Sequence, residues 1–261
     1  MPGAPEPVVA VHARVHGAAD APAVVLAHSL GTDHRVWAPQ IELLAERFRV
    51  IAVDQRGHGE SPAPAGPYAI SDLGWDLVAL LDRLEISRAH LVGTSLGAMA
   101  ALWVAANEPA RVDRLVACSA SAHLDSADAW TDRAQIVRSN GTVAIVDGAV
   151  HRWFGGSQRP EDEVLDRVIA RFVGTSDEGY AACCEALGSM DLREDVTRIT
   201  ARTLVVAGER DLAIPTAHSE DLAARIPGAK LRMIPDAGHL LSLERPATLN
   251  TLLEEHLSQP A

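Results

Sequence analysis

A serine flanked by two glycines is the feature of this sequence most able to do chemistry. Ser95 lies in Gly93-Thr94-Ser95-Leu96-Gly97, between the apolar pair Leu91-Val92 and an alanine-rich run at 98–106. Glycines two residues before and after the serine leave room for a sharp strand-to-helix turn, where the two elements approach closely. Such a turn presents a serine hydroxyl at the C-terminal edge of a sheet. The pattern predicts a nucleophilic serine, although an ordinary buried turn has the same local sequence.

A serine hydroxyl is a weak nucleophile at neutral pH, so it needs a base within hydrogen-bond reach and a carboxylate that orients the base. His239 follows the last predicted strand and is the candidate base. Asp211 follows the preceding buried run and is the candidate acid, although it also fits a helix N-cap. Glu209 and Asp236 are rival acids that lie less well with respect to the strand ends.

Acyl transfer also needs N–H donors for the oxyanion that develops on the attacked carbonyl group. The helix after the serine starts with free N–H groups and the positive end of its dipole, so we expect the N–H of Leu96 to be one donor. The loop His28-Ser29-Leu30-Gly31 follows an early buried strand, and the N–H of Leu30 is the second candidate. We expect His28 and His58 to shape this loop and a turn rather than to act as the base.

Composition sets broad limits. The chain has 261 residues, of which 48% are hydrophobic, so it can form one large α/β domain or a domain with an insertion. No apolar run is long enough to cross a membrane, and the first residues lack the pattern of a signal peptide, so we expect a cytoplasmic protein. The formal net charge of −12 disfavours nucleic acid as a partner. It leaves a small anionic substrate possible, because one local arginine can outweigh the global field.

The three cysteines, Cys118, Cys183 and Cys184, show no metal-ligand spacing. We expect them to be reduced packing residues, and we expect no metal site.

The apolar pattern predicts the elements that must position these residues. Residues 8–15 alternate like a strand with one wet face, which favours antiparallel pairing. The continuous apolar run at 23–27 is typical of a strand covered on both faces. Further buried strands are predicted at 49–53, 112–118 and 202–208, and another strand at 229–234. Helices are expected between them, including one capped by Ser71 and others at 37–46, 215–226 and 246–257. This alternation predicts a mostly parallel, doubly wound sheet.

The pattern changes between His123 and Glu194. No buried strand is predicted there, and amphipathic helical stretches follow one another at 129–139, 142–154, 161–173 and 177–189. We therefore expect an α-helical cap at 123–194, inserted into a core made of 1–122 and 195–261.

Together these features resemble the α/β-hydrolase superfamily across nearly the whole chain, and its order of serine, acid and histidine matches Ser95, Asp211 and His239. A narrower resemblance is to the 3-oxoadipate enol-lactonases. It is carried by His28-Ser29-Leu30-Gly31-Thr32-Asp33 with Trp37, Asp54-Gln55-Arg56-Gly57-His58-Gly59-Glu60-Ser61, and above all Gly179-Tyr180-Ala181-Ala182-Cys183-Cys184-Glu185-Ala186-Leu187 with Met190-Asp191-Leu192-Arg193. Ala98 departs from the second glycine expected after Gly97.

The resemblance implies a cofactor-free hydrolase that opens an enol-lactone ring in the degradation of aromatic compounds. Its substrate carries a free carboxylate, for which a cap arginine is the natural partner. Arg133 is the first candidate, with Arg193 and Arg152 next, although a solvated face of a cap helix would also account for Arg133. Trp130 and Trp153 are candidate apolar walls, and packing in the core of the cap is the alternative for both. The first alternative is a carboxylesterase or lactonase of the same fold with another small ester substrate. The second is a non-catalytic binding protein of that fold. The oligomeric state stays open.

Overall fold

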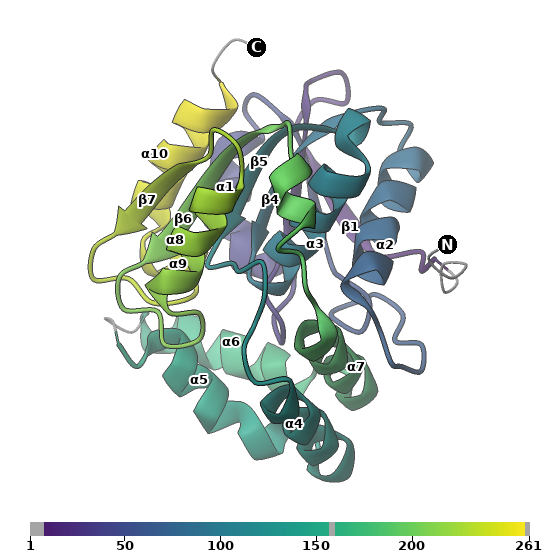
Figure 1. The fold of residues 1–261 in the computed structure, drawn as a ribbon, viewed down its shortest axis with the longest axis vertical. Helices are drawn as coiled ribbons and strands as arrows, with labels where there is room; N and C mark the ends of the chain where they lie inside the picture. The colour runs from purple at the N-terminus through teal and green to yellow at the C-terminus, as the bar shows by residue number, and fades with distance from the viewer. Residues whose placement is uncertain (1–7, 157–159, 259–261) are drawn as a thin grey trace.

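The fold is built on one twisted sheet in a computed structural model that describes residues 8–156 and 160–258 (Figure 1). The described residues form seven strands in the order β1-β3-β2-β4-β5-β6-β7. Only β1 is antiparallel to its neighbour, and all the other pairs are parallel. The strands are β1 (Ala13–His16), β2 (Ala23–Ala27), β3 (Arg49–Val53), β4 (Ala89–Thr94), β5 (Val112–Cys118), β6 (Arg202–Gly208) and β7 (Lys230–Ile234).

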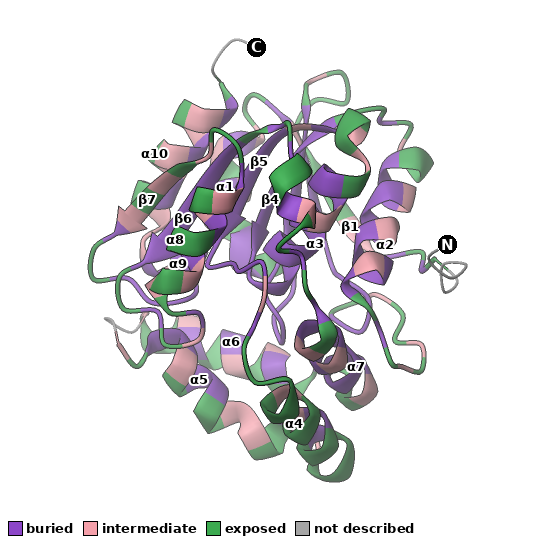
Figure 2. Ribbon diagram, viewed as in Figure 1, coloured by how far each residue is buried: buried purple, intermediate pink, exposed green. Residues whose placement is uncertain are grey.

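Helices cover both faces of the sheet, which is why its central strands read as continuous apolar runs (Figure 2). Alternate residues of β2 enter different cores, with Val25 in one and Val24 in the other. The first core includes helices α2 (Ile70–Arg83), α3 (Leu96–Asn107) and α8 (Thr216–Arg225). The second includes α1 (Ala38–Leu44), α9 (Leu241–Glu244) and α10 (Pro246–Leu257). The mostly parallel, doubly wound sheet expected from the sequence is confirmed.

Between β5 and β6, the described residues form four further α-helices, which lie as a layer beyond the C-terminal ends of the strands (Figure 1). They are α4 (Ala127–Asn140), α5 (Val146–Phe154), α6 (Asp162–Val173) and α7 (Asp177–Ser189). We call them the α4–α7 layer. Arg138 of α4 holds α7 through hydrogen bonds to Glu178 at 2.8 Å and to Glu185 at 2.5 Å. Short 3-10 helices complete the described chain at η1 (His34–Trp37), η2 (Pro109–Arg111), η3 (Thr142–Ile145) and η4 (Asp195–Arg198).

Two local expectations are wrong. The strand expected at 8–15 is limited to Ala13–His16, because the chain turns earlier, where the Val11 N–H donates to the Val9 carbonyl. The cap expected at Ser71 is also wrong, because α2 starts at Ile70 with Ala69 as its N-cap. The Asp72 carboxylate accepts a hydrogen bond from the Ala69 N–H and supplies the cap from inside the helix.

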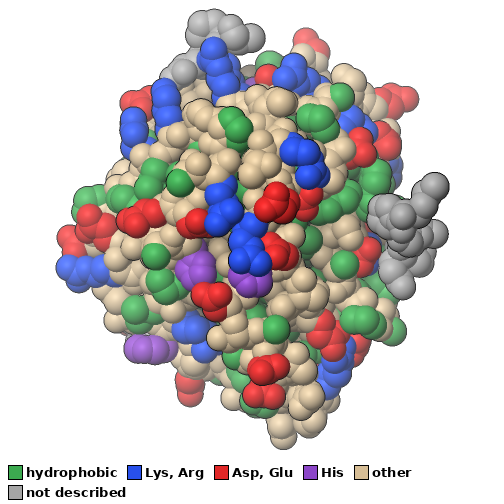
Figure 3. All heavy atoms as spheres, viewed as in Figure 1, with side chains coloured by type: hydrophobic (Ala, Val, Ile, Leu, Met, Phe, Trp, Pro, Cys, Tyr) green, Lys and Arg blue, Asp and Glu red, His purple; other side chains and the backbone are tan. Residues whose placement is uncertain are grey.

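Charged side chains of both signs are interspersed on the face of the molecule drawn in Figure 3. Surface charges of the described residues form local pairs, such as Arg193 with Asp191 and Arg225 with Asp221. Exposed pairs of this kind add little stability. Among the described helices, none is both long and apolar enough to span a membrane.

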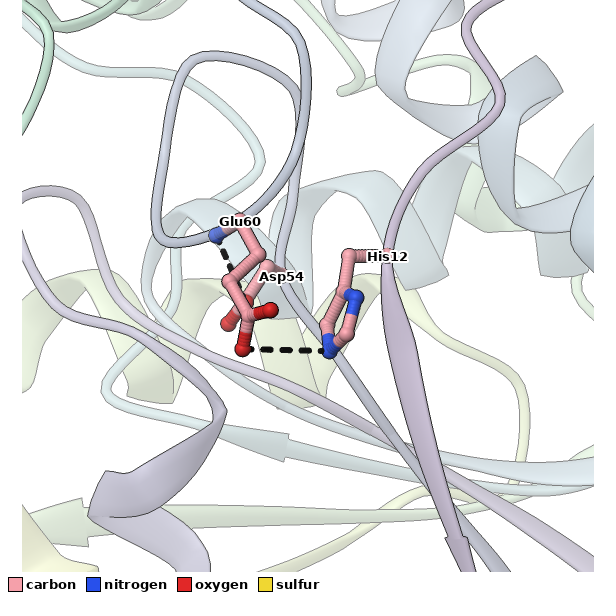
Figure 4. Close-up of side chains that lie close together, drawn as sticks. All are labelled: His12, Asp54 and Glu60. Atoms are coloured by element: carbon pink, nitrogen blue, oxygen red, sulfur yellow. Dashed lines mark hydrogen bonds and ion pairs between the residues drawn. The ribbon is translucent and has the colours of Figure 1, made fainter.

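A cluster of His12, Asp54 and Glu60 ties the chain before β1 to the loop after β3 (Figure 4). Hydrogen bonds already occupy the buried Asp54 carboxylate, from the N–H groups of His34 at 2.8 Å and Glu60 at 3.0 Å. Burial opposes ionisation of Asp54, but these bonds outweigh it and hold the pKa of the carboxyl far below its ordinary value. Glu60 also accepts a hydrogen bond from Arg14. We interpret the cluster of His12, Asp54 and Glu60 as structural, because its contacts hold the loop that carries His58 in place.

Candidate active site

Ser95 stands at the junction of β4 and α3 with a backbone that few residues adopt. Its φ is 53° and its ψ is −118°, in the left-handed region that favours glycine. A Cβ atom at Gly93 would lie 2.4 Å from the Ala98 nitrogen, and one at Gly97 would lie 2.4 Å from the Ala27 carbonyl oxygen. The two glycines are therefore required by close backbone approach, as the sequence pattern indicates.

Asp211 and His239 meet across the loops that follow β6 and β7. The His239 Nδ1 donates to Asp211 Oδ2 at 2.8 Å, and both side chains are buried. The other carboxylate oxygen of Asp211 accepts hydrogen bonds from the N–H groups of Ala213 and Ile214, each at 2.8 Å. Asp211 thus organises the turn before α8 and orients the histidine at the same time. Because Nδ1 carries the proton, Nε2 of His239 is left as the proton acceptor.

His239, whose Nε2 is the proton acceptor, lines a cavity together with Ser95. The hydroxyl of Ser29, in the loop after β2, lies 3.4 Å from this nitrogen. Sequence reasoning did not single out Ser29 as a neighbour of the histidine. The rival acids lie elsewhere, since Glu209 is exposed and Asp236 is an exposed partner of Arg210. A serine and an acid–histidine pair at one cavity can carry out acyl transfer.

The backbone around Ser95 and Leu30 leaves two N–H groups unused. Ser95 N donates to the Cys118 carbonyl, Gly97 N to the His28 carbonyl and Gly31 N to His58 Nε2. Within the described part of the chain, no acceptor is bonded to the N–H of Leu30 or Leu96. These are the two groups that the sequence singled out as oxyanion donors.

The cavity encloses about 70 Å³ between the sheet edge and the α4–α7 layer. The expected cap residues Trp130, Arg133 and Trp153 all line it, and Arg133 stacks on the Trp130 ring at 4.8 Å. Arg193 does not line it, because its exposed side chain pairs with Asp191 at 2.6 Å. The remaining lining residues were not expected from the sequence, apart from Leu30 and the reserve candidate Arg152; they are Ser29, Ala149, Tyr180, Leu187, Ala213 and Ile214.

Comparison with known proteins identifies the family. A family model described as the alpha/beta hydrolase fold matches residues 22–140. The chain is 36% identical over 247 residues to 3-oxoadipate enol-lactonase 2 of Acinetobacter baylyi, covering 94% of this chain and 92% of that protein. The chain belongs to the α/β-hydrolase family. This hydrolase is also 37% identical over 262 residues to a putative carbamate hydrolase RutD of Variovorax paradoxus, with 95% and 96% of the two chains covered.

Solved structures agree with this family. The enol-lactonase from Burkholderia xenovorans LB400 superposes on this hydrolase with a TM-score of 0.90 at 36% identity. The alignment covers 96% of this chain and 97% of that one. These relatives show that the chain is a hydrolase of this family. Because an enol-lactonase and a putative carbamate hydrolase reach similar identity, the comparisons do not identify its substrate.

Two buried histidines hold the Leu30 loop of this hydrolase. His58 Nε2 accepts the Gly31 N–H at 2.9 Å, and His28 Nε2 accepts the Gln55 N–H at 2.9 Å, so both rings are neutral. Burial and the nearby His28 ring lower the pKa of His58 to about 3, and burial also lowers the pKa of His28. The neutral state of His58 is therefore part of the folded structure.

Acid should weaken the fold through His58. Between its folded pKa of about 3 and the ordinary unfolded value, the unfolded chain binds one more proton, so stability is present at neutral pH and lost as pH falls through this window. His58 should contribute a slope of about 1.4 kcal/mol per pH unit. Urea unfolding of wild type and His58→Gln from pH 7 to pH 4 should show the stability advantage of wild type falling by about 1.4 kcal/mol for each pH unit below the ordinary histidine pKa, about 3 kcal/mol in all. The exposed His16→Gln is the control. A gap between wild type and His58→Gln that stays constant with pH would contradict the prediction.

Proposed function

We propose that this hydrolase opens the lactone ring of 3-oxoadipate enol-lactone to 3-oxoadipate through an acyl-enzyme. The observation that carries the proposal is the charge of the cavity. Two arginines, Arg133 and Arg152, line it together with Ser95 and His239, and no acidic side chain of the described residues does. Such a cavity suits a compact ester or lactone with a carboxylate, and relatives named enol-lactonases support this substrate.

Acylation is the first step of the proposed reaction. The Ser95 hydroxyl attacks the lactone carbonyl carbon while His239 Nε2 takes its proton, and Asp211 stabilises the imidazolium that forms. The N–H groups of Leu30 and Leu96 bind the oxyanion. The bond from the acyl carbon to the ring oxygen then breaks, and its electron pair stays on that oxygen as an enolate. The enolate is stabilised by resonance, and it becomes a ketone when its carbon takes up the proton that His239 received from Ser95, which returns His239 to its neutral form for the next step.

Deacylation uses the same residues. A water molecule attacks the acyl carbon while His239 Nε2 takes its proton, and the electron pair of the ester bond returns to Ser95 with that proton. The product carries two carboxylates, the original one and the one formed at the acyl carbon. In this proposal Arg133 binds the original carboxylate, and Trp130 and Trp153 enclose the apolar part of the substrate.

Replacing Arg133 with methionine should lower kcat/KM for the enol-lactone selectively. A charge-assisted bond to a carboxylate is worth about 1.5–3 kcal/mol, so the expected loss is roughly ten- to more than a hundredfold. Methionine keeps much of the stem that covers Trp130. A neutral p-nitrophenyl ester should therefore be hydrolysed about as well as before. The measurement is kcat/KM for both substrates in wild type and in Arg133→Met.

The pattern of losses decides how the prediction is judged. Equal losses on the lactone and on the neutral ester would mean that the substitution damaged the α4–α7 layer generally. No loss on either would mean that Arg133 does not bind the substrate.

The substrate itself is tested by the fall in ultraviolet absorbance when the purified protein is added to the enol-lactone. A small anionic carbamate is the second candidate substrate, because relatives named putative carbamate hydrolases reach 37% identity. Release of ammonia from such a carbamate, without any change in the lactone, would overturn the proposed substrate and keep the hydrolase.

A further inference from the structure

Arg152 lies on α5 beside the point where this helix contacts the candidate base. The next residue, Trp153, accepts a hydrogen bond from the His239 N–H at 3.0 Å through its carbonyl oxygen. The Arg152 side chain is partly buried and lines the same cavity as Ser95. Its Nη1 lies 3.4 Å from the position that a Cβ atom of Gly148 would take, so the guanidinium runs back along α5 where no side chain stands. The hydrogen bond between His239 and Trp153 thus fixes the α5 backbone next to Arg152 close to the candidate base.

The charge of Arg152 is not balanced in the free protein. Among the described residues, no carboxylate lies within ion-pair distance of it, and the nearby Arg133 repels it. Burial, and then Arg133, lower its pKa. Arg133 likewise has no carboxylate partner among the described residues, but its guanidinium stacks on the Trp130 ring at 4.8 Å. A partly buried cation without an anion is costly, so its presence points to negative charge that arrives with the ligand.

The charges of the proposed reaction explain why the cavity has two arginines. The enol-lactone carries one negative charge, on its carboxylate, and Arg133 balances it. When the ring opens, a second negative charge develops on the ring oxygen. That oxygen is bound to the carbon that bears the carboxymethyl group, so the two charges lie close together. The two positive charges of the cavity therefore balance the two negative charges of the transition state better than the single negative charge of the substrate. This difference is the condition for catalysis by electrostatic stabilisation.

We propose that Arg152 is a catalytic residue that stabilises the negative charge on the departing ring oxygen, while Arg133 binds the carboxylate. This inference rests on the proposed function. Arg152 forms its strongest interaction only as the bond breaks. It therefore acts on kcat, whereas Arg133 acts on binding of the substrate and on KM.

The test compares Arg152→Met and Arg152→Lys with wild type on the enol-lactone. Arg152→Met should lower kcat about a hundredfold and change KM by less than about threefold. Arg152→Lys keeps the charge and should recover part of kcat. The loss should be much smaller on a p-nitrophenyl ester, because that leaving group is stable as an anion. Removal of an unbalanced cation should leave the melting temperature of Arg152→Met unchanged or raised.

Arg167→Met is the matched control, because Arg167 is an exposed arginine of α6 that pairs with Glu163 outside the cavity. It should behave like wild type. A rise in KM alone for Arg152→Met would overturn the inference and make Arg152 a second carboxylate-binding residue. Unchanged kinetics, equal losses on both substrates, or a lowered melting temperature with no recovery in Arg152→Lys would also overturn it. A wild type that leaves the lactone intact would instead refute the proposed function, and the inference would fall with it.

Discussion

Replacing Ser95 with alanine is expected to abolish hydrolysis and to leave the free energy of unfolding nearly unchanged. Loss of the nucleophile in a serine protease lowers kcat by roughly 10⁶-fold, and a comparable loss is expected here. The hydroxyl of Ser95 has no hydrogen-bond partner among the described residues, so its removal leaves no buried group unsatisfied. Enol-lactone turnover and thermal unfolding of Ser95→Ala measure the two halves of this prediction.

Ser29 provides the matched control, because its hydroxyl lies only 3.4 Å from His239 Nε2. Ser29→Ala should cost far less than Ser95→Ala. A fluorophosphonate probe should label wild type and Ser29→Ala on Ser95, as peptide mass spectrometry can show, and should not label Ser95→Ala. A label on Ser29, or an active Ser95→Ala, would mean that the nucleophile has been assigned to the wrong serine.

Replacing Asp211 with asparagine should lower kcat by about 10⁴-fold, as the same change does in a serine protease. The structure gives the reason. One side-chain oxygen must keep accepting the N–H groups of Ala213 and Ile214, so the new amide NH₂ faces His239 Nδ1. That nitrogen must then accept a hydrogen bond, which places the ring proton on Nε2 and removes the base. Because the turn before α8 keeps its bonds, the melting temperature should change little.

Two substitutions of the rival acids complete this experiment. Asp236→Asn and Glu209→Gln should leave kcat within a few-fold of wild type, because both side chains are exposed and lie away from His239. Measured kcat values for the three variants rank the acids directly. If Asp236→Asn were the most damaging, the acid would have to be reassigned.

Structural features that are set by residues close together in the chain could be predicted from the sequence. The buried strands are runs of apolar residues because helices cover both faces of the sheet. The spacing of Gly93 and Gly97 predicts the turn at Ser95, because a Cβ atom at either position would collide with backbone atoms. The boundaries of α7 and α10 match the prediction because their ends are marked locally by polar residues and proline.

Two local signals failed, the first because of a contact distant in sequence and the second because a neighbouring residue competes. Residues 8–15 alternate like a strand, yet Val9 N donates to the buried Asp76 of α2, and the chain turns before β1 begins. Ser71 is a good helix cap by residue type, but the carboxylate of Asp72 reaches back to Ala69 and moves the start of α2.

The sequence by itself determined the fold class, the position of Ser95 and the pairing of Asp211 with His239, because the C-terminal ends of parallel strands must meet at one edge. Only the tertiary structure decided which arginines serve the cavity. The sequence makes Arg133 the first candidate and Arg193 and Arg152 the next, but in the structure Arg133 of α4 and Arg152 of α5 line the cavity, while Asp191 holds Arg193 at the surface. The physical reason is that the direction of a side chain on a packed helix depends on contacts distant in sequence, such as the bond from His239 to α5.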